Sequence, residues 1–552
     1  MNRKPWIKNY DAHVPPTLNY PQISIVDLLN NSTKNFPDNT CLIYEDLEFS
    51  YSDVGYLSDR LASGLIHLGV KPGVRVGIVL PNIPQFITAY FGILKAGAIV
   101  VAINPQYRPR EIVEMVNSSQ VETIFCLSEK FHEIIEVKEK SCLKKIIKCQ
   151  IEDLTWLKDF QPLQKKIEKT VNQDQFDFSD LFLAEIEKDK FPSVLPEHPA
   201  VFQFTGGTTG TPKAAIGLHR NLVANTRQFI SWCDLKAGKE TVLAVIPLYH
   251  VYGMVLALCL GIALGAKIIL NSNPKEIEKI LRSIEKHQVS FFPGVPSLYY
   301  AINQNPEVQK LRYGLNSIKA CISGSAPLHP EIKTTFELLS GGKLMEGYGL
   351  SEAPTATHCN PLYGENRTGS IGLPLPDVDC QIVDIKDNKK PVRIGEIGEL
   401  IIKGPQVMLG YHNDGLETNQ TLQNGWLHTG DIVRMDEDGY FYIVDRKKSL
   451  IKVSGFQVWP NEIEQVLGSH PAIKEAGVGG VPDKEQGEKV IAWVVVKPGE
   501  KTDAKGLKEW CRIYLAAYKI PSEIFFVEEI PKTSVGKILR RELIRQYLNN
   551  QK

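Results

Sequence analysis

The segment of this chain best suited to chemistry is Thr205–Lys213, which directly follows the apolar run 200–204. Its three glycines and four threonines can present backbone N–H groups and hydroxyls to an anion without obstruction, and Lys213 adds positive charge. These donors predict a polyphosphate-binding loop between a buried strand and a helix. A Walker loop is excluded, because Pro212 precedes Lys213 and Ala214 follows it. A flexible Gly/Thr connection is the structural alternative.

Helical and strand patterns alternate on both sides of this loop. Leucines at helical spacing over 57–68 end at Gly69, and the apolar run 74–80 follows. The helix-like stretch 85–95 likewise leads to the strand-like run 98–103. This alternation predicts an α/β fold with doubly wound sheets.

The rest of the chain divides by composition. Residues 151–191 are charge-rich and poorly periodic, which indicates a surface excursion. Short strand-like runs punctuated by Gly and Pro predict a small β subdomain over about 369–444. We therefore predict an N-terminal domain over 1–444, a charged hinge at 445–449 and a mobile α+β C-terminal domain over 450–552.

Composition limits the classes of function. A chain of 552 residues is long enough for several folding units. Lys plus Arg and Asp plus Glu are both 63, so the zero formal charge gives no general attraction to nucleic acid or anionic lipid. The ten scattered cysteines contain no C-x-x-C pair, which favours a reducing cytoplasm over a disulfide framework.

One apolar stretch tests the cytoplasmic prediction. Residues 241–266 contain no Asp, Glu, Lys or Arg and are long enough to span a bilayer. Pro247, His250 and several glycines interrupt the stretch. We expect a buried strand over 241–246 followed by a buried helix over 255–264.

The glycine and threonine loop resembles the phosphate loop of the adenylate-forming superfamily, which includes the acyl-CoA synthetases. Gly206 stands where serine is common there, and this spelling is similar to that of the long-chain fatty-acid:CoA ligases. The other motifs of the family follow in order across nearly the whole chain, as Pro247–His250, Ser323–Pro327, Glu346–Glu352, Trp426–Asp431 and Pro531–Lys537.

The resemblance implies a set of nucleotide contacts. Tyr348 would stack on adenine, Asp431 and Arg446 would contact the ribose, and Lys537 would be the catalytic lysine, with Thr208 and Glu352 also catalytic. Glu352 and Thr208 would hold Mg²⁺, for which a carboxylate is a suitable hard ligand. The full set of expected ATP or AMP contacts is Thr205, Gly206, Gly207, Thr208, Thr209, Gly210, Thr211, Lys213, Ser323, Gly324, Ser325, Ala326, Glu346, Gly347, Tyr348, Gly349, Ser351, Asp431, Ile443, Arg446 and Lys537.

The resemblance also implies two further subsites and a hinge. An acyl pocket would include His250, Val251, Gly253 and Gly294, and a CoA-side face would include Lys452, Ser454 and Gly455. Lys448 would be the hinge, although Ser449 follows it where aspartate is common in the family. A core role for His250 and a solvated linker around Lys448 are the structural alternatives.

The reaction implied is that of an acid–thiol ligase. A fatty acid, preferably long-chain, would react with ATP to give acyl-adenylate and pyrophosphate, and coenzyme A would then displace AMP. A medium-chain or aryl acid:CoA ligase, or an adenylating enzyme with a different acceptor, is the alternative. A homodimer and transient contact with a membrane surface stay open.

Overall fold

The computed structural model describes residues 4–153, 174–205, 212–483, 485–533 and 537–550. These residues form two compact units. The larger unit comprises Trp6–Asp379 and Lys403–Leu427, and the smaller comprises Cys380–Ile402 and His428–Lys552 with Met1–Pro5. The domain boundaries at 444 and 449 stay predictions.

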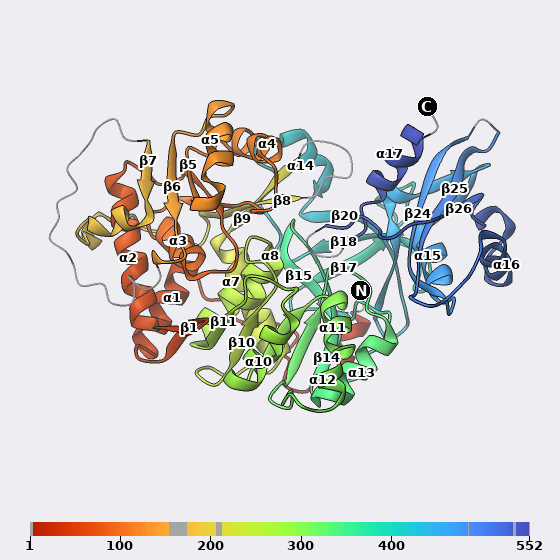
Figure 1. The fold of residues 1–552 in the computed structure, drawn as a ribbon, viewed down its shortest axis with the longest axis horizontal. Helices are drawn as coiled ribbons and strands as arrows, with labels where there is room; N and C mark the ends of the chain where they lie inside the picture. Colours follow the sequence, from red (N-terminus) through yellow and green to blue (C-terminus); the bar gives the residue numbers. More distant parts are fainter. Residues whose placement is uncertain (1–3, 154–173, 206–211, 484, 534–536, 551–552) are drawn as a thin grey trace. The chain divides into compact units, whose positions relative to one another are not determined.

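Two largely parallel sheets organise the larger unit (Figure 1). The seven-stranded sheet has the order β7 (Gln175–Asp177), β6 (Lys145–Cys149), β5 (Thr123–Leu127), β3 (Arg75–Val79), β4 (Ile99–Ala102), β8 (Pro199–Thr205) and β9 (Lys213–Leu218). The nine-stranded sheet has the order β16 (Leu373–Pro374), β15 (Ala353–Cys359), β14 (Lys343–Leu350), β13 (Ala320–Ser323), β12 (Phe291–Gly294), β10 (Thr241–Ala244), β11 (Lys267–Leu270), β1 (Thr40–Tyr44) and β2 (Leu47–Ser50).

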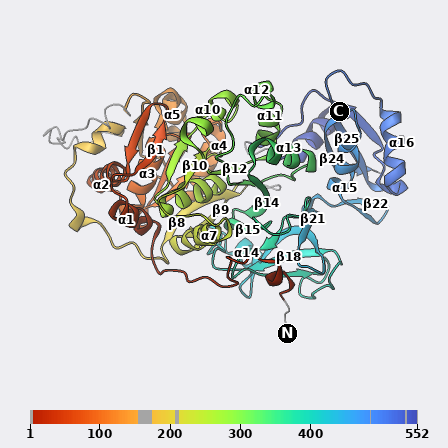
Figure 2. The same ribbon diagram turned by 90° about the horizontal axis from the view of Figure 1, so that it is seen from below.

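Helices cover and separate these sheets. They are α1 (Ile25–Asn35), α2 (Tyr51–His67), α3 (Pro84–Lys95), α4 (Pro109–Ser119), α5 (Phe131–Glu139), α7 (His219–Trp232), α10 (Ile277–His287), α11 (Pro296–Asn303), α12 (Pro306–Gln309), α13 (Pro330–Ser340) and α14 (Gly415–Thr421). Helices α2 and α3 pack side by side, as Figures 1 and 2 show, with α2 against β1 and β2 and α3 against β3 and β4. Because α3 contacts packed elements on every side, all of its residues are buried.

Local signals fix where these helices begin. Ser50 caps α2, since its hydroxyl accepts from Asp53 N at 3.0 Å while the Asp53 carboxylate accepts from Ser50 N at 2.8 Å. Such a reciprocal cap is typically worth about 1 kcal/mol. The predicted strands at 74–80 and 98–103 are confirmed as β3 and β4, so the doubly wound α/β prediction is correct.

The uncharged stretch 241–266 is confirmed as core. Strand β10 is followed by α8 (Val251–Gly253), the π-helical η5 (Met254–Cys259) and α9 (Leu260–Leu264), and nearly all of their residues are buried. Within the described part of the chain, no helix combines the length and apolarity needed to cross a membrane.

The surface excursion expected over 151–191 is wrong for part of that range. Strand β7 extends the seven-stranded sheet, and Phe178 and Phe182 of the following η3 (Phe178–Leu183) are fully buried. Three apolar side chains among many charges were too few to show a period in the sequence. Residues 154–173 lie outside the described part of the chain.

The smaller unit contains one β-rich part and one α+β part. The first is built on β17 (Asp379–Val383), β18 (Gly398–Lys403), β20 (Trp426–Met435) and β21 (Phe441–Arg446), while the short β19 (Leu422–Gln423) pairs with the start of β20. The second is a sheet of β23 (Phe456–Val458), β22 (Ile451–Val453), β25 (Gly487–Val496), β24 (Ile473–Asp483) and β26 (Glu523–Phe526), with helices α15 (Pro460–Gly468), α16 (Ala504–Tyr514) and α17 (Arg540–Asn550).

Candidate functional site

The ends of the predicted phosphate loop are held together by strand pairing. Thr205, the last residue of β8, is the antiparallel partner of Lys213, the first residue of β9. The expected contacts Gly206–Thr211, which include the candidate metal ligand Thr208, lie outside the described residues. The expectation that a helix follows the loop directly is wrong, because β9 intervenes before α7.

Lys213 already has an acidic partner in this structure. Its Nζ lies 2.7 Å from Glu417 Oε2, and each side chain is 28% exposed. The same Nζ lies 5.8 Å from the centroid of the Tyr411 ring. The lysine is therefore positioned at the end of the loop by residues that the sequence did not single out.

The expected adenine-side residues lie at the ends of two adjacent parallel strands. Ser323 of β13 and Glu346 of β14 are register partners, and both are buried. Burial raises the pKa of Glu346 to about 8. Its Oε1 accepts from Leu328 N at 3.3 Å. Within the described residues, Ser323 Oγ and Glu346 Oε2 are buried without a hydrogen-bond partner, so this edge has unused capacity for a polar ligand.

The loop and strand around these two residues require glycines. A Cβ at Gly349 would lie 1.7 Å from Thr355 O, so no larger residue fits there. Tyr348 is half-buried, and its ring lies 5.8 Å from that of its strand partner His358, at 67°. Gly324, Ser325 and Ala326 follow β13 directly, with Ser325 at φ +71°.

Glu352 precedes β15, next to the expected phosphate contact Ser351. The hydroxyl of Tyr411 donates to Glu352 Oε1 at 2.8 Å, and Met408 N donates to Glu352 O at 2.8 Å. Burial, with the Glu352 charge as a second cause, raises the pKa of Tyr411 well above its ordinary value, so the phenol stays a donor.

The donor set at Glu352 fits Mg²⁺ bound together with a nucleotide. Within the described ranges, no three His, Cys, Asp or Glu side chains converge as a metal cluster. Glu352 would therefore supply a single carboxylate, and magnesium commonly takes one or two protein carboxylates beside phosphate oxygens and water. Thr208, the second expected ligand, is not among the described residues.

The expected acyl-pocket residues meet near the end of β12. His250 Nδ1 accepts from Tyr252 N at 3.2 Å, and burial lowers the pKa of His250 to about 4. A Cβ at Gly253 would lie 2.4 Å from Pro247 O, and one at Gly294 would lie 2.7 Å from the Tyr299 ring. Both glycines are therefore required by the packing of the protein itself.

Tyr252 connects this region to the adenine-side strand, and sequence reasoning did not identify it. Its hydroxyl donates to Gly294 O at 2.9 Å and to Ile322 O at 2.7 Å. The buried Val251 precedes it in the chain. The predicted acyl-pocket residues and the end of β13 thus belong to one hydrogen-bonded cluster.

In the smaller unit, the two expected ribose residues contact each other. Asp431 of β20 and Arg446 of β21 are strand partners, and Arg446 Nε lies 2.6 Å from Asp431 Oδ1. The Asp431 side chain is 3% exposed, whereas that of Arg446 is 38% exposed. Ile443, the third expected residue here, pairs with Val433 on the same two strands.

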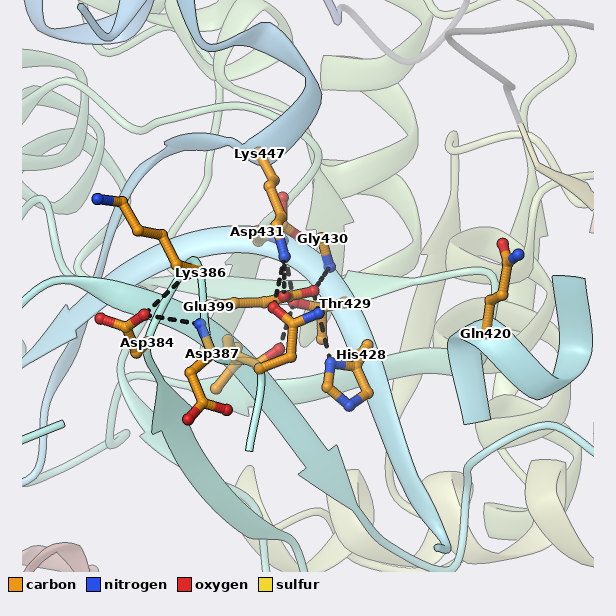
Figure 3. Close-up of polar contacts among 12 residues, drawn as sticks. Asp384, Lys386, Asp387, Glu399, Gln420, His428, Thr429, Gly430, Asp431 and Lys447 are labelled. Carbon is orange, nitrogen blue, oxygen red and sulfur yellow. Dashed lines mark hydrogen bonds and ion pairs between the residues drawn. The ribbon is translucent and has the colours of Figure 1, made fainter. Parts of the chain in front are cut away.

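A buried glutamate supports this turn and was missed in the sequence. Figure 3 shows Lys447, Gly430 and His428 converging on the carboxylate of Glu399. Gly430 N donates to Glu399 Oε1 at 3.2 Å, and Lys447 Nζ lies 2.7 Å from Oε2. A single acidic residue within the apolar strand β18 was the available signal, because a buried carboxylate requires partners.

The residue expected to be the hinge immediately follows Lys447. Lys448 lies in the short helical turn η6 (Lys447–Ser449). Lys447 is attached at two points, since its Nζ also donates to Asn388 Oδ1 at 2.9 Å. The chain is thus fixed just before the expected hinge.

The expected CoA-side residues form the turn between β22 and β23. Ser454 has φ +49° and Gly455 has φ +85°. A Cβ at Gly455 would meet nothing within 4 Å, so the glycine is required by backbone conformation rather than by space. Lys452 N donates to Glu488 Oε2 at 2.7 Å.

Lys537 lies in a narrow, exposed loop. Lys537 N donates to Thr533 Oγ1 at 3.1 Å, and Thr533 N donates to Lys537 O at 2.8 Å. Residues 534–536 are outside the described part of the chain. Arg540 Nε, which donates to Glu464 Oε1 at 2.9 Å, fixes the start of α17 just after the loop.

Known proteins with these features share a family. The model of the AMP-binding enzyme family matches residues 29–412, and that of the AMP-binding enzyme C-terminal domain matches 462–537. A long-chain-fatty-acid–CoA ligase of Bacillus subtilis (strain 168) is 40% identical over 565 residues, covering 100% of this chain and 99% of that protein. A ligase of the same name from Escherichia coli O6:H1 is 37% identical, covering 98% of each chain.

The fold has a solved counterpart. The crystal structure of the anthranilate CoA ligase AuaEII in complex with anthranoyl-AMP superposes with a TM-score of 0.82 at 25% identity. The match covers 97% of this chain and 99% of that one. With two family models matched in order and relatives aligned over the full length, the chain belongs to the AMP-binding enzyme family.

Proposed function

We propose that the protein is an AMP-forming long-chain fatty-acid:CoA ligase. The observation that carries this proposal is the full-length similarity, at 37–40% identity, to proteins named long-chain-fatty-acid–CoA ligase. The match extends over both the AMP-binding segment and the C-terminal segment. ATP and coenzyme A are the co-substrates of such a ligase.

The reaction follows from the chemistry of a carboxylate. At neutral pH its oxygens leave poorly, so one of them must first be joined to a good leaving group. In the first step, a carboxylate oxygen attacks the α-phosphorus of ATP, and pyrophosphate leaves. In the second, the sulfur of coenzyme A attacks the acyl carbon, AMP departs with that oxygen, and the thiol proton is released.

The chain's own residues would bind and orient the reactants. Lys213 and Lys537 offset negative charge on the phosphates, and Glu352 holds the magnesium ion. When bound, magnesium supplies charge neutralisation at the phosphate oxygens. Lys213 is 2.7 Å from Glu417, so it changes partner when the nucleotide enters.

Ribose recognition falls to the Asp431 and Arg446 pair. Asp431 is held in place by Arg446 and by its own N–H, which donates to Thr429 Oγ1 at 3.1 Å. A fixed carboxylate of this kind accepts from ribose hydroxyls. Tyr348 offers its ring to adenine from the neighbouring motif.

The two steps place different demands on the residues around the acyl carbon. Lys537 acts in the first step and must leave the path of the thiol in the second. A rotation about Lys448 that replaces the Lys537 loop by the Ser454 and Gly455 turn meets this demand. The exposed position of Lys537 and the attachment of Lys447 before the hinge support this proposal.

Chain length is set by the acyl pocket. Each methylene transferred from water is worth about 0.8 kcal/mol, so small differences in depth change the preferred acid strongly. Relatives named for long-chain acids favour a long-chain substrate. The solved relative that binds anthranoyl-AMP keeps an aryl acid as the alternative, beside medium-chain acids and an acceptor other than coenzyme A.

Cellular context is part of the same proposal. Fatty acids place the enzyme in lipid metabolism, with transient contact to a membrane surface and a homodimer as its candidate associations. A reducing cytoplasm is supported by cysteines such as Cys126, which is buried and has its pKa raised to about 12 by that burial.

Pyrophosphate release with acids of graded length, with and without coenzyme A, tests the function. We expect acid-dependent release that is maximal with long-chain acids, and acyl-CoA only when coenzyme A is present. ATP binding without acid-dependent pyrophosphate release would contradict the proposal. A maximum with an aryl acid would replace the substrate class and leave the reaction intact.

A further inference from the structure

A segment outside the predicted motifs lies against both ends of the phosphate machinery. Residues 408–412 pair with β9, since Ile216 N donates to Gly410 O and His412 N donates to Ala214 O, both at 2.9 Å. Met408 N of the same segment donates to Glu352 O at 2.8 Å. The backbone therefore joins the strand that begins at Lys213 to the residue expected to hold the metal.

The side chain of Tyr411 makes the same connection. Its hydroxyl donates to Glu352 Oε1 at 2.8 Å, and its ring centroid lies 5.8 Å from Lys213 Nζ. Glu417, one turn further along, holds the same Nζ at 2.7 Å. One phenol thus touches the carboxylate and faces the ammonium group.

Tyr411 is itself held firmly. Its side chain and backbone are buried, with 8% of the residue exposed, and Tyr411 N donates to Thr418 Oγ1 at 2.9 Å. Asp414 caps α14 through a bond from Glu417 N at 3.0 Å. Since the segment is fixed by these local bonds, the hydroxyl has a defined direction.

We propose that Tyr411 is a positioning residue that orients the Glu352 carboxylate toward the magnesium ion and sets its separation from Lys213. The hydroxyl fixes Oε1, so that Oε2 turns to the cation. Residues that orient a metal ligand typically contribute about 10- to 100-fold to metal affinity. This inference rests on the proposed function, because it assumes that Glu352 binds the metal of a metal–ATP complex.

Binding of ATP without any acid, measured by calorimetry in EDTA and at increasing Mn²⁺, tests the proposal without turnover. In the wild type, we expect Mn²⁺ to strengthen ATP binding. Tyr411→Phe keeps the ring and removes only the hydroxyl, so ATP binding in EDTA should stay within about twofold. The Mn²⁺ concentration for half-maximal strengthening should rise about tenfold.

Two further variants keep the test specific. Tyr20→Phe removes a comparable bond, from a phenol to Asp377 Oδ2 at 2.8 Å, and should leave the Mn²⁺ dependence unchanged. Glu352→Gln should remove most of that dependence, and adding Tyr411→Phe to it should have little further effect. Thermal unfolding confirms that each variant is folded.

A Tyr411→Phe protein that matches the wild type in Mn²⁺ dependence, while Glu352→Gln does not, would overturn the positioning role. Additive effects of the two substitutions would overturn it as well. Failure of the proposed function has a different signature, namely no acid-dependent pyrophosphate release by the wild type.

Discussion

The strand edge around Ser323, Glu346 and Gly349 differs from the loop that carries Lys537. The first consists of buried register partners and of a glycine with no room for a methyl group. The second is exposed and closed by two bonds between Thr533 and Lys537. Groups that recognise a nucleotide in both steps are thus built into sheets, whereas the group needed in one step lies where it can leave.

The largest effect in this comparison is expected from Lys537→Ala. Losing one group that stabilises the developing charge should slow acyl-adenylate formation by about 100-fold or more. Thioester synthesis from supplied acyl-adenylate should stay near the wild-type rate, because that step does not use the lysine. Quenched single-turnover assays of each half-reaction measure both rates.

Lys532→Ala is the matched control, since Lys532 lies in the same loop but pairs with Glu475. It should leave both half-reactions near wild type. Equal losses in the two half-reactions for Lys537→Ala would contradict the division between a permanent strand edge and a one-step loop.

Gly349→Ala tests the rigidity of the strand edge. The new Cβ would meet Thr355 O at 1.7 Å, so the strand must shift, at a cost of about 3 kcal/mol in unfolding free energy. Gly468→Ala, with nothing within 4 Å of its Cβ at the end of α15, should be neutral or stabilising by under about 1 kcal/mol. Denaturant unfolding measures both, and equal effects would mean that the edge is not close-packed.

A pH series on Glu346→Gln probes the same edge electrostatically. The folded-state pKa of Glu346, raised to about 8 by burial, lies above the model value of 4.5. The folded protein therefore keeps a proton that the unfolded chain releases, and wild-type stability falls as pH rises from 4.5 to 8. The glutamine variant lacks this loss.

The stability of Glu346→Gln relative to wild type should accordingly rise with pH, by up to about 1.4 kcal/mol per unit across that window. Urea unfolding at several pH values between 4.5 and 8 gives the difference. A flat difference would show that Glu346 is ionised in the folded protein.

The smallest effect is expected at the support of the ribose turn. Glu399→Gln keeps the shape of the side chain but weakens its interaction with Lys447, which is 30% exposed. The KM for ATP should rise about threefold to tenfold with kcat nearly unchanged, because the turn that presents Asp431 loosens. An unchanged KM, or an equal fall in kcat, would argue against this supporting role.

Much of the fold was readable from periodicity, because parallel strands such as β3, β4 and β5 are continuous apolar runs. The short strand β7 was missed, since it has three residues and only one of them is partly buried. Strand β9 was also missed, because a loop that ends in lysine and proline gives no local sign of a returning strand. Pairing with β8 decides its structure.

The candidate site divides along a similar line. Residues within dense motifs, such as Glu352 and Asp431, were identified from their neighbours in sequence. Tyr411, Glu417 and Glu399 were not, because their significance depends on contacts with Lys213, Glu352 and Lys447 over separations of 48 or more positions. Such contacts exist only once the chain has folded.

The oxygen balance of the reaction tests the central claim most directly. A long-chain fatty acid labelled with ¹⁸O in both carboxylate oxygens is converted with ATP and coenzyme A, and the AMP and pyrophosphate are analysed by mass spectrometry. Attack on the α-phosphorus predicts one labelled oxygen in AMP and none in pyrophosphate. Labelled inorganic phosphate with ADP, or AMP without label, would contradict the proposed adenylation.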